Sequence, residues 1–215
     1  MIDPKKTKIY WDEVAKETSL SNKTAVGMLT DGNEFNAINR SIEEEAHFMR
    51  IFQPTKSMKV LEVGSGGGRW AFFLADKVSN VVGIDFSENM INLAEQQRAE
   101  RGVDNVTFIN TDLLSYENEE TFDLVYFSGV LQYLGDADVV SSISKAKSML
   151  KLGGLIISRD TVQELRRIVF DGQYPVVYRT IDEYQAIFQA ENFRLDYCEL
   201  SYSTKRFSHF ASRVS

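Results

Sequence analysis

The sequence predicts an α/β fold with a doubly wound, mostly parallel seven-stranded sheet, a C-terminal antiparallel hairpin and an N-terminal helical cap. Three observations indicate this class. Short apolar runs alternate with helical patterns from residue 59 to about residue 160, a glycine-rich turn follows the first run, and two strand-like runs lie near the end of the chain. Alternating strands and helices form βαβ units with right-handed crossovers, which build a parallel sheet.

The central elements follow from their periodicity. We predict strands near residues 59–63, 80–84, 105–109, 122–127 and 154–158, with helices near 68–78, 87–101 and 137–150. The last helix places apolar side chains on one face, and a Gly153-Gly154 turn then leads into an apolar run.

After residue 160 the pattern changes. Thr180 is followed three residues later by Glu183, a capping box that predicts the start of a helix. Two runs, Phe193–Leu200 and Phe207–Phe210, are typical of strands. Because they are consecutive and joined by a short connection, we expect them to pair antiparallel at the edge of the sheet.

The N-terminal section carries none of the sheet, so we divide the chain into a helical cap at residues 1–54 and a main domain at residues 55–215. Two helix faces are expected in the cap. They are formed by Trp11, Val14, Ala15 and Thr18, and by Ile42, Ala46 and Met49 before the break at Pro54.

Composition excludes several functions. With 215 residues, 43% hydrophobic and 26% charged, the chain is typical of a globular domain with a full core. No apolar run approaches the roughly 20 residues of a membrane span, and we expect a cytoplasmic protein. The net charge of −7 disfavours a nucleic-acid partner. The single cysteine forms no internal disulfide, and His47 and His209 are too isolated to predict a metal site.

The glycine turn and the acidic residue after the second strand predict a ligand site. Glycines at Gly64 and Gly66 permit unusual dihedral angles and close approach of a ligand. The N–H groups of the following helix favour a carboxylate or phosphate. About twenty residues later, Asp85 ends the second strand, where a carboxylate accepts hydrogen bonds from ribose hydroxyls.

Arg69 occupies the place of the third glycine in the dinucleotide pattern G-x-G-x-x-G, which argues against a dinucleotide. The run Glu62-Val-Gly-Ser-Gly-Gly-Gly68 instead resembles the first motif of class I, Rossmann-like S-adenosylmethionine-dependent methyltransferases. The resemblance covers roughly residues 55–215. It implies that S-adenosyl-L-methionine is the cofactor, S-adenosyl-L-homocysteine its product, and methyl transfer the reaction.

Each part of this cofactor calls for a different residue type. Gly64, Ser65 and Gly66 let the backbone close on the amino-acid end, and Glu62 balances its ammonium group. Asp85 is assigned to the ribose. An apolar cover for the adenine is expected from Phe86 and Met90.

The resemblance implies the remaining cofactor contacts. Asp112 accepts the adenine amino group, and the N–H of Leu113 contacts a ring nitrogen. Ser128 and Gly129, at the end of the fourth strand, line the sulfonium. Tyr10 and Trp11 resemble an aromatic pair that lies across the cofactor cleft in similar enzymes.

The acceptor is less well determined by the sequence. The chain lacks the N/D-P-P-Y/F signature at the end of the fourth strand, which disfavours nucleobase and glutamine amides as acceptors. Orientation of two bound reactants suffices for a good nucleophile such as an amine or carboxylate, whereas a hydroxyl also needs a base.

The resemblance places acceptor contacts after the fourth and fifth strands. Arg159 and Arg179 are candidates to bind a carboxylate or phosphate of the acceptor. Tyr133, Asp160 and Tyr178 are candidates to orient or deprotonate it. Any one of these residues is equally well explained as part of a surface ion pair or an aromatic shelf.

Our leading hypothesis is methyl transfer to a small molecule through a nitrogen, oxygen or carboxylate nucleophile. Other classes stay open: a protein or RNA methyltransferase, a nicotinamide-dependent oxidoreductase, and a non-catalytic module that binds the cofactor. The sequence predicts neither the acceptor nor the oligomeric state.

Overall fold

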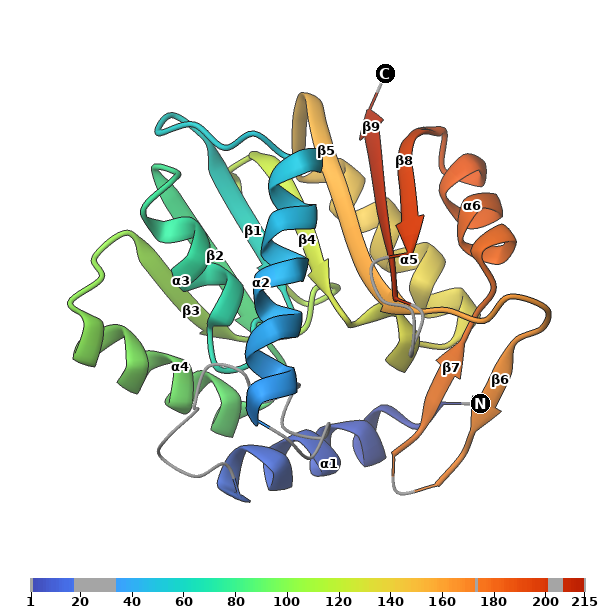
Figure 1. Ribbon diagram of the computed structural model, residues 1–215, viewed down its shortest axis with the longest axis horizontal. Coiled ribbons are helices and arrows are strands. Elements are labelled where there is room, and N and C mark those ends of the chain that lie inside the picture. The colour runs from blue at the N-terminus through green and yellow to red at the C-terminus, as the bar shows by residue number, and fades with distance from the viewer. Residues whose placement is uncertain (1, 18–33, 173, 201–206, 215) are drawn as a thin grey trace.

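The computed structural model describes residues 2–17, 34–172, 174–200 and 207–214, with the backbone alone for 17, 34–37 and 207–214. Its main sheet has the strand order β3-β2-β1-β4-β5-β9-β8 (Figure 1). The first five strands in chain order pair in parallel, and the two C-terminal strands extend the sheet as an antiparallel hairpin. The predicted α/β class, with a parallel sheet and a C-terminal hairpin, is confirmed. The strands are β1 (Lys59–Val63), β2 (Asn80–Asp85), β3 (Val106–Asn110), β4 (Phe122–Ser128), β5 (Leu150–Thr161), β8 (Phe193–Leu200) and β9 (Phe207–Val214).

Helices cover both faces of the sheet. One apolar core lies between the sheet and side chains that include Phe48, Trp70 and Ile91, and the other includes Ile143 and Phe188. Because both faces are covered, the central strands are almost continuous apolar runs. The helices that contribute these residues are α2 (Glu34–Ile51), α3 (Arg69–Ala75) and α4 (Glu88–Arg101) on one face, and α5 (Asp136–Ser148) and α6 (Ile181–Ala190) on the other.

The predicted capping box is confirmed. The side-chain oxygen of Thr180 accepts a hydrogen bond from the N–H of Glu183 at 3.2 Å, and the Thr180 N–H donates to Oε2 of Glu183 at 2.8 Å. Helix α4 begins in a similar way, with Ser87 as its N-cap accepting from the N–H of Met90. Local side-chain chemistry therefore fixes both helix starts.

The region after β4 differs from the prediction. A short 3-10 helix, η2 (Leu131–Tyr133), follows β4, and β5 begins four residues earlier than expected. Gly153 lies within β5 with φ 77°, next to a register shift against β4. After β5, the segment in which acceptor contacts were expected forms a separate hairpin of β6 (Ile168–Phe170) and β7 (Val176–Tyr178).

Helix α1 (Pro4–Glu17) lies along the edge of the sheet at which the parallel strands end (Figure 1). Asp12 holds it there, because its carboxylate accepts from the Ser87 hydroxyl and its carbonyl oxygen accepts from the Asn89 side chain at 3.2 Å. The cap thereby reaches the N-terminus of α4. Thr18, predicted on the same helix face, lies outside the described residues.

The predicted apolar face of α2 is confirmed only at Met49, which is partly buried against the core, and is wrong at Ile42 and Ala46. Ile42 is 60% exposed and Ala46 is also exposed, whereas Glu44 and Phe48 are buried. The helix is rotated so that a carboxylate and an aromatic ring face the main domain. None of the helices in the described part of the chain has the length and apolarity that crossing a membrane requires.

Candidate active site

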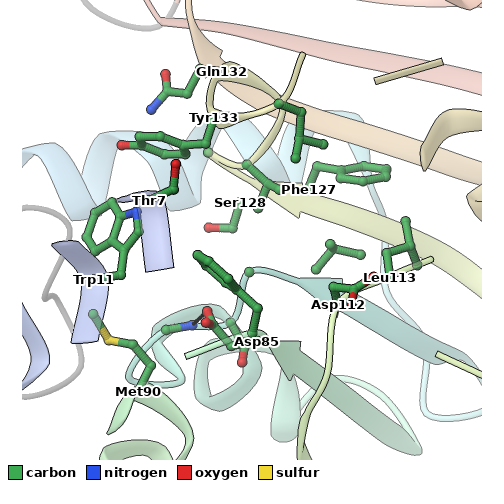
Figure 2. A pocket seen from close by; sticks show the side chains of 18 of the residues that line it. Thr7, Trp11, Asp85, Met90, Asp112, Leu113, Phe127, Ser128, Gln132 and Tyr133 are labelled. Carbon is green, nitrogen blue, oxygen red and sulfur yellow. Dashed lines mark hydrogen bonds between the residues drawn. The ribbon is translucent and has the colours of Figure 1, made fainter. Parts of the chain in front are cut away.

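A cavity of about 1390 Å³ opens at the ends of the parallel strands (Figure 2). Its walls come from the turns after β1, β2, β3 and β4, and from α1, α2 and the β6–β7 hairpin. In the strand order, β1 lies between β2 and β4: the chain runs outward from β1 through β2 to β3 and then returns to the other side of β1 at β4. Open α/β sheets bind ligands at such a switch point.

The glycine turn after β1 forms the floor of this cavity. Gly64 and Gly66 have φ values of 73° and 50°, a region that glycine adopts without strain. The N–H groups of Gly64 and Ser65 both donate to the carbonyl oxygen of Ile84, at 2.9 and 3.0 Å. A Cβ atom on Gly64 would lie 2.2 Å from Cγ2 of Val130, so this position also lacks the space for a side chain.

Asp85 ends β2 beside this turn and is 7% exposed. Its Oδ2 accepts from the N–H of Gly66 and its Oδ1 from the N–H of Ser87, both at 2.9 Å. Burial raises the pKa of Asp85 to about 6, although the two N–H donors act in the opposite direction. The carboxylate is thus fixed at the cavity wall.

Glu62, at the end of β1, is almost completely buried and also lines the cavity. Burial raises the pKa of Glu62 well above its usual range, against the influence of Arg69 and the N–H of Ala71. Within the described part of the chain, Oε2 of Glu62 and Oγ of Ser65 have no hydrogen-bond partner. Buried polar atoms are rarely left in this state, which indicates that a polar or cationic ligand group belongs beside them.

The structure brings together all the side chains predicted to contact the cofactor. The remaining ones also line the cavity, and Figure 2 shows several of them around a common space. Asp112 in addition accepts hydrogen bonds from the Ser115 N–H and hydroxyl, at 3.0 and 2.8 Å, which fix its side chain. These lining residues are Tyr10, Trp11, Phe86, Met90, Asp112, Leu113, Ser128 and Gly129.

Aromatic rings from three elements close one end of the cavity. Tyr10 and Tyr174 have ring centroids 4.7 Å apart, and those of Trp11 and Tyr133 are 5.6 Å apart. The hydroxyls of Tyr133 and Tyr174 are hydrogen-bonded to each other. Tyr133 and Tyr178, two of the predicted acceptor residues, therefore lie at this end with Tyr174, which the sequence did not single out.

The assignment of Asp160 to the acceptor is not supported, because its side chain is fully buried and does not line the cavity. Its carboxylate accepts hydrogen bonds from the N–H of Gln132, at 3.1 Å, and from the Ser158 hydroxyl. Burial raises the pKa of this carboxyl. Asp160 therefore holds the turn after β4 against β5.

Arg179 is likewise fully buried away from the cavity. Its guanidinium donates to the carbonyl oxygens of Leu131 and Leu134, at 2.9 and 2.8 Å, and to Oδ1 of Asp136 at 2.7 Å. These hydrogen bonds satisfy backbone carbonyl groups in and just after η2, and they pair the guanidinium with a carboxylate at the start of α5. Arg179 thus has a structural role in these contacts, and its position outside the cavity does not support its assignment to the acceptor.

Arg159 does line the cavity, as part of a cluster that sequence reasoning missed. Glu44 of α2 is 2% exposed and accepts from three arginines. The distances are 3.0 Å to Nε of Arg40, 2.9 Å to Nη1 of Arg69 and 2.6 Å to Nη2 of Arg159. All three arginines line the cavity. They hold the pKa of Glu44 far below its usual range despite its burial.

The fold and this cavity agree with a comparison against known protein families. The family described as a methyltransferase domain matches residues 54–194. The match covers more than half of the chain, and the chain therefore belongs to the methyltransferase-domain family.

Individual relatives are more distant. Phosphoethanolamine N-methyltransferase 1 of Triticum aestivum is 28% identical over 163 residues, which are 74% of this chain and 31% of that protein. A ubiquinone biosynthesis O-methyltransferase of Hydrogenovibrio crunogenus is 29% identical over 141 residues, 63% of this chain and 56% of its own. The chain thus spans about a third of the length of the wheat protein.

A solved structure supports the fold. Phosphoethanolamine N-methyltransferase 1 of Haemonchus contortus, in complex with phosphoethanolamine and S-adenosylhomocysteine, superposes with a TM-score of 0.78. The sequence identity is 20%, and the superposition covers 97% of this chain and 48% of that one. At this identity the similarity establishes the fold alone.

Proposed function

We propose that this chain transfers a methyl group from S-adenosylmethionine to a small-molecule acceptor. One observation carries the proposal: the glycine turn, the carboxylates of Glu62 and Asp85, and the end of β4 meet in one cavity at the switch point of the sheet. Membership of the methyltransferase-domain family supports it. The relatives described above are named for small acceptors, which favours a small molecule over protein or RNA.

The residues suit the parts of the cofactor. Asp85, held by two N–H groups, offers its remaining lone pairs to the two ribose hydroxyls. The buried oxygens of Glu62 and Ser65 that lack partners are suited to the ammonium group. A cation beside Glu62 favours its ionised form, which offsets the effect of burial.

The other end of the methionine part is a carboxylate, and a cluster of guanidinium groups lies beside the glycine turn. Arg69 follows the turn directly, and Arg40 lines the same cavity. We assign the cofactor carboxylate to these two side chains because charge-assisted hydrogen bonds from arginine suit such a group. Phe86 and Met90 cover the adenine, and Asp112 accepts its amino group.

When bound, the cofactor would supply a methyl group on a positively charged sulfur: the acceptor atom would bond to the methyl carbon in line as the carbon–sulfur bond breaks, and S-adenosylhomocysteine would leave with that electron pair. Ser128 and Gly129 shape the space in which the acceptor approaches that carbon. Burial raises the pKa values of Tyr133 and Tyr178 above the usual tyrosine value, so both hydroxyls stay protonated near neutral pH. They orient the acceptor as hydrogen-bond partners and do not deprotonate it.

A transfer assay tests the proposal. The protein is incubated with S-adenosylmethionine labelled in the methyl group and with amines, phosphate or carboxylate compounds and hydroxylated metabolites. We expect label in at least one product, formed in equal amount with S-adenosylhomocysteine, and roughly 5- to 50-fold less label with Asp85→Ala at a cofactor concentration near the wild-type Kd, because that variant should bind the cofactor about 10- to 100-fold more weakly. Tight cofactor binding without transfer to any acceptor would favour the non-catalytic module instead.

A further inference from the structure

Gln132 lines the cavity, and hydrogen bonds to residues of β5 fix its orientation. Its backbone N–H donates to the buried carboxylate of Asp160 at 3.1 Å. Its side-chain oxygen Oε1 accepts from the N–H of Thr161 at 2.9 Å. Because the amide oxygen has this partner in β5, the NH2 group is turned toward the cavity, where Gln132 lies beside Tyr133 (Figure 2).

Three tyrosines lie at the same end of the cavity as Gln132. The Tyr133 and Tyr174 hydroxyls are hydrogen-bonded to each other, and Tyr178 lines the cavity with both of them. A phenol hydroxyl carries one hydrogen that it can donate, so Tyr178 offers a donor to a bound group.

Three kinds of hydrogen-bond donor line this cavity. The Gln132 amide and the Tyr178 hydroxyl supply two of them. Arg159 adds a guanidinium, and its Nη1 lies 3.3 Å from where a Cβ atom on Gly129 would be. A site that offers amide, phenol and guanidinium donors is complementary to a group with several acceptor oxygens and negative charge.

We propose that this end of the cavity binds an oxyanion of the methyl acceptor, a phosphate, phosphonate or carboxylate, through the Gln132 amide, the Tyr178 hydroxyl and Arg159. The inference rests on the proposed function and adds the chemical class of the acceptor. It assigns Gln132 as a specificity-determining residue. The Asp160 carboxylate and the Thr161 N–H act as positioning groups, because they contact Gln132.

The test uses the whole chain saturated with S-adenosylhomocysteine, which keeps small anions away from the site assigned to the cofactor carboxylate. Binding of inorganic phosphate, methylphosphonate, acetate and tetramethylammonium is measured by NMR or calorimetric titration. We expect at least one of the three anions to bind, and more tightly than tetramethylammonium. The order of the affinities of the three anions distinguishes phosphate, phosphonate and carboxylate acceptors.

Two variants locate the binding. Gln132→Glu keeps an oxygen for the Thr161 N–H but replaces the donor by a negative charge, and it should weaken anion binding at least tenfold. Tyr178→Phe removes one donor and should weaken it several-fold. Tyr116→Phe is the matched control, because that hydroxyl accepts from Asn118 at 2.7 Å and does not line the cavity.

The outcomes are separable. Failure of S-adenosylhomocysteine to bind contradicts the proposed function itself. Binding of S-adenosylhomocysteine with no binding of any anion, or with tighter binding of tetramethylammonium, overturns the oxyanion site alone. Anion binding that is equal in the wild type, Gln132→Glu and Tyr178→Phe would also overturn it. If Gln132→Glu does not fold, the comparison of Tyr178→Phe with Tyr116→Phe decides.

Discussion

The carboxylate of Asp85 and the N–H of Gly66 form a hydrogen bond of 2.9 Å, which joins the end of β2 to the turn after β1. A second N–H, from Ser87, holds the other carboxylate oxygen. The carboxylate is therefore oriented before any ligand binds. Preorganisation of this kind lowers the entropy that binding must overcome.

Replacing Asp85 tests its assignment to the ribose. Asp85→Ala should weaken binding of S-adenosylhomocysteine by one to two orders of magnitude, because a hydrogen bond to a charged group contributes about 1.5–3 kcal/mol. Isothermal titration calorimetry measures the change. Asp76→Ala is the control, since Asp76 is an exposed carboxylate at the end of α3. Wild-type affinity in a folded Asp85→Ala protein would contradict the assignment.

The same carboxylate predicts a pH dependence of binding. The pKa of Asp85 is raised to about 6 by burial, and its neighbours Asp12 and Lys8 act in opposite directions. Ribose hydroxyls donate to the ionised form, so the Asp85 contribution to S-adenosylhomocysteine affinity should be nearly full from about one pH unit above its pKa and fall as the pH drops through about 6, by up to about tenfold per pH unit below it.

The pKa of Glu62 is also raised by burial. Because its ionised form binds the ammonium group, protonation of Glu62 should likewise lower the affinity as the pH falls. Titrations with S-adenosylhomocysteine between pH 5 and 8 measure this pH dependence of affinity. Asp85→Asn should remove the part of it that comes from Asp85. Affinity that rises as the pH falls would contradict this account.

Glu44 should be important for stability. Glu44→Gln leaves the buried guanidinium groups of Arg40, Arg69 and Arg159 without the carboxylate they share, and loss of one member of a buried ionic group costs about 3–5 kcal/mol. Glu43→Gln, an exposed neighbour on the same helix, should change stability by less than about 0.5 kcal/mol. Denaturant unfolding measures both, and equal stabilities would show that the cluster is dispensable.

Gly64 and Gly102 provide a matched pair of glycines with positive φ. Gly102→Ala has open space around the new Cβ and should cost about 1–2 kcal/mol from backbone strain alone. Gly64→Ala adds the clash with Val130, so it should be more destabilising and should also reduce cofactor affinity. Unfolding and titration experiments on both variants check this. Gly64→Ala behaving like Gly102→Ala would mean that the turn has room to adjust.

The cofactor half of the site was predictable because its signals are local. The turn around Gly64 and the acidic end of β2 at Asp85 are contiguous motifs, and parallel strands bring their carboxyl ends to one edge. The capping box at Thr180 is local in the same way.

The acceptor half depends on contacts between distant segments. Arg159 and Arg179 look equivalent in sequence, but Arg179 donates to backbone carbonyls of the turn after β4 and pairs with Asp136, all more than forty residues away. Glu44 stands between two other glutamates in a run typical of a solvated face, and only the rotation of α2 buries it. The orientation of Gln132 depends on hydrogen bonds with Asp160 and Thr161, about thirty residues further along the chain.

The most direct measurement is a crystal structure of the protein with S-adenosylhomocysteine. Our account predicts the ribose hydroxyls on Asp85, the ammonium group beside Glu62 and Ser65, and the sulfur near Ser128 and Gly129. A complex with the ligand bound elsewhere, or a cavity that stays empty at saturating ligand, would contradict it.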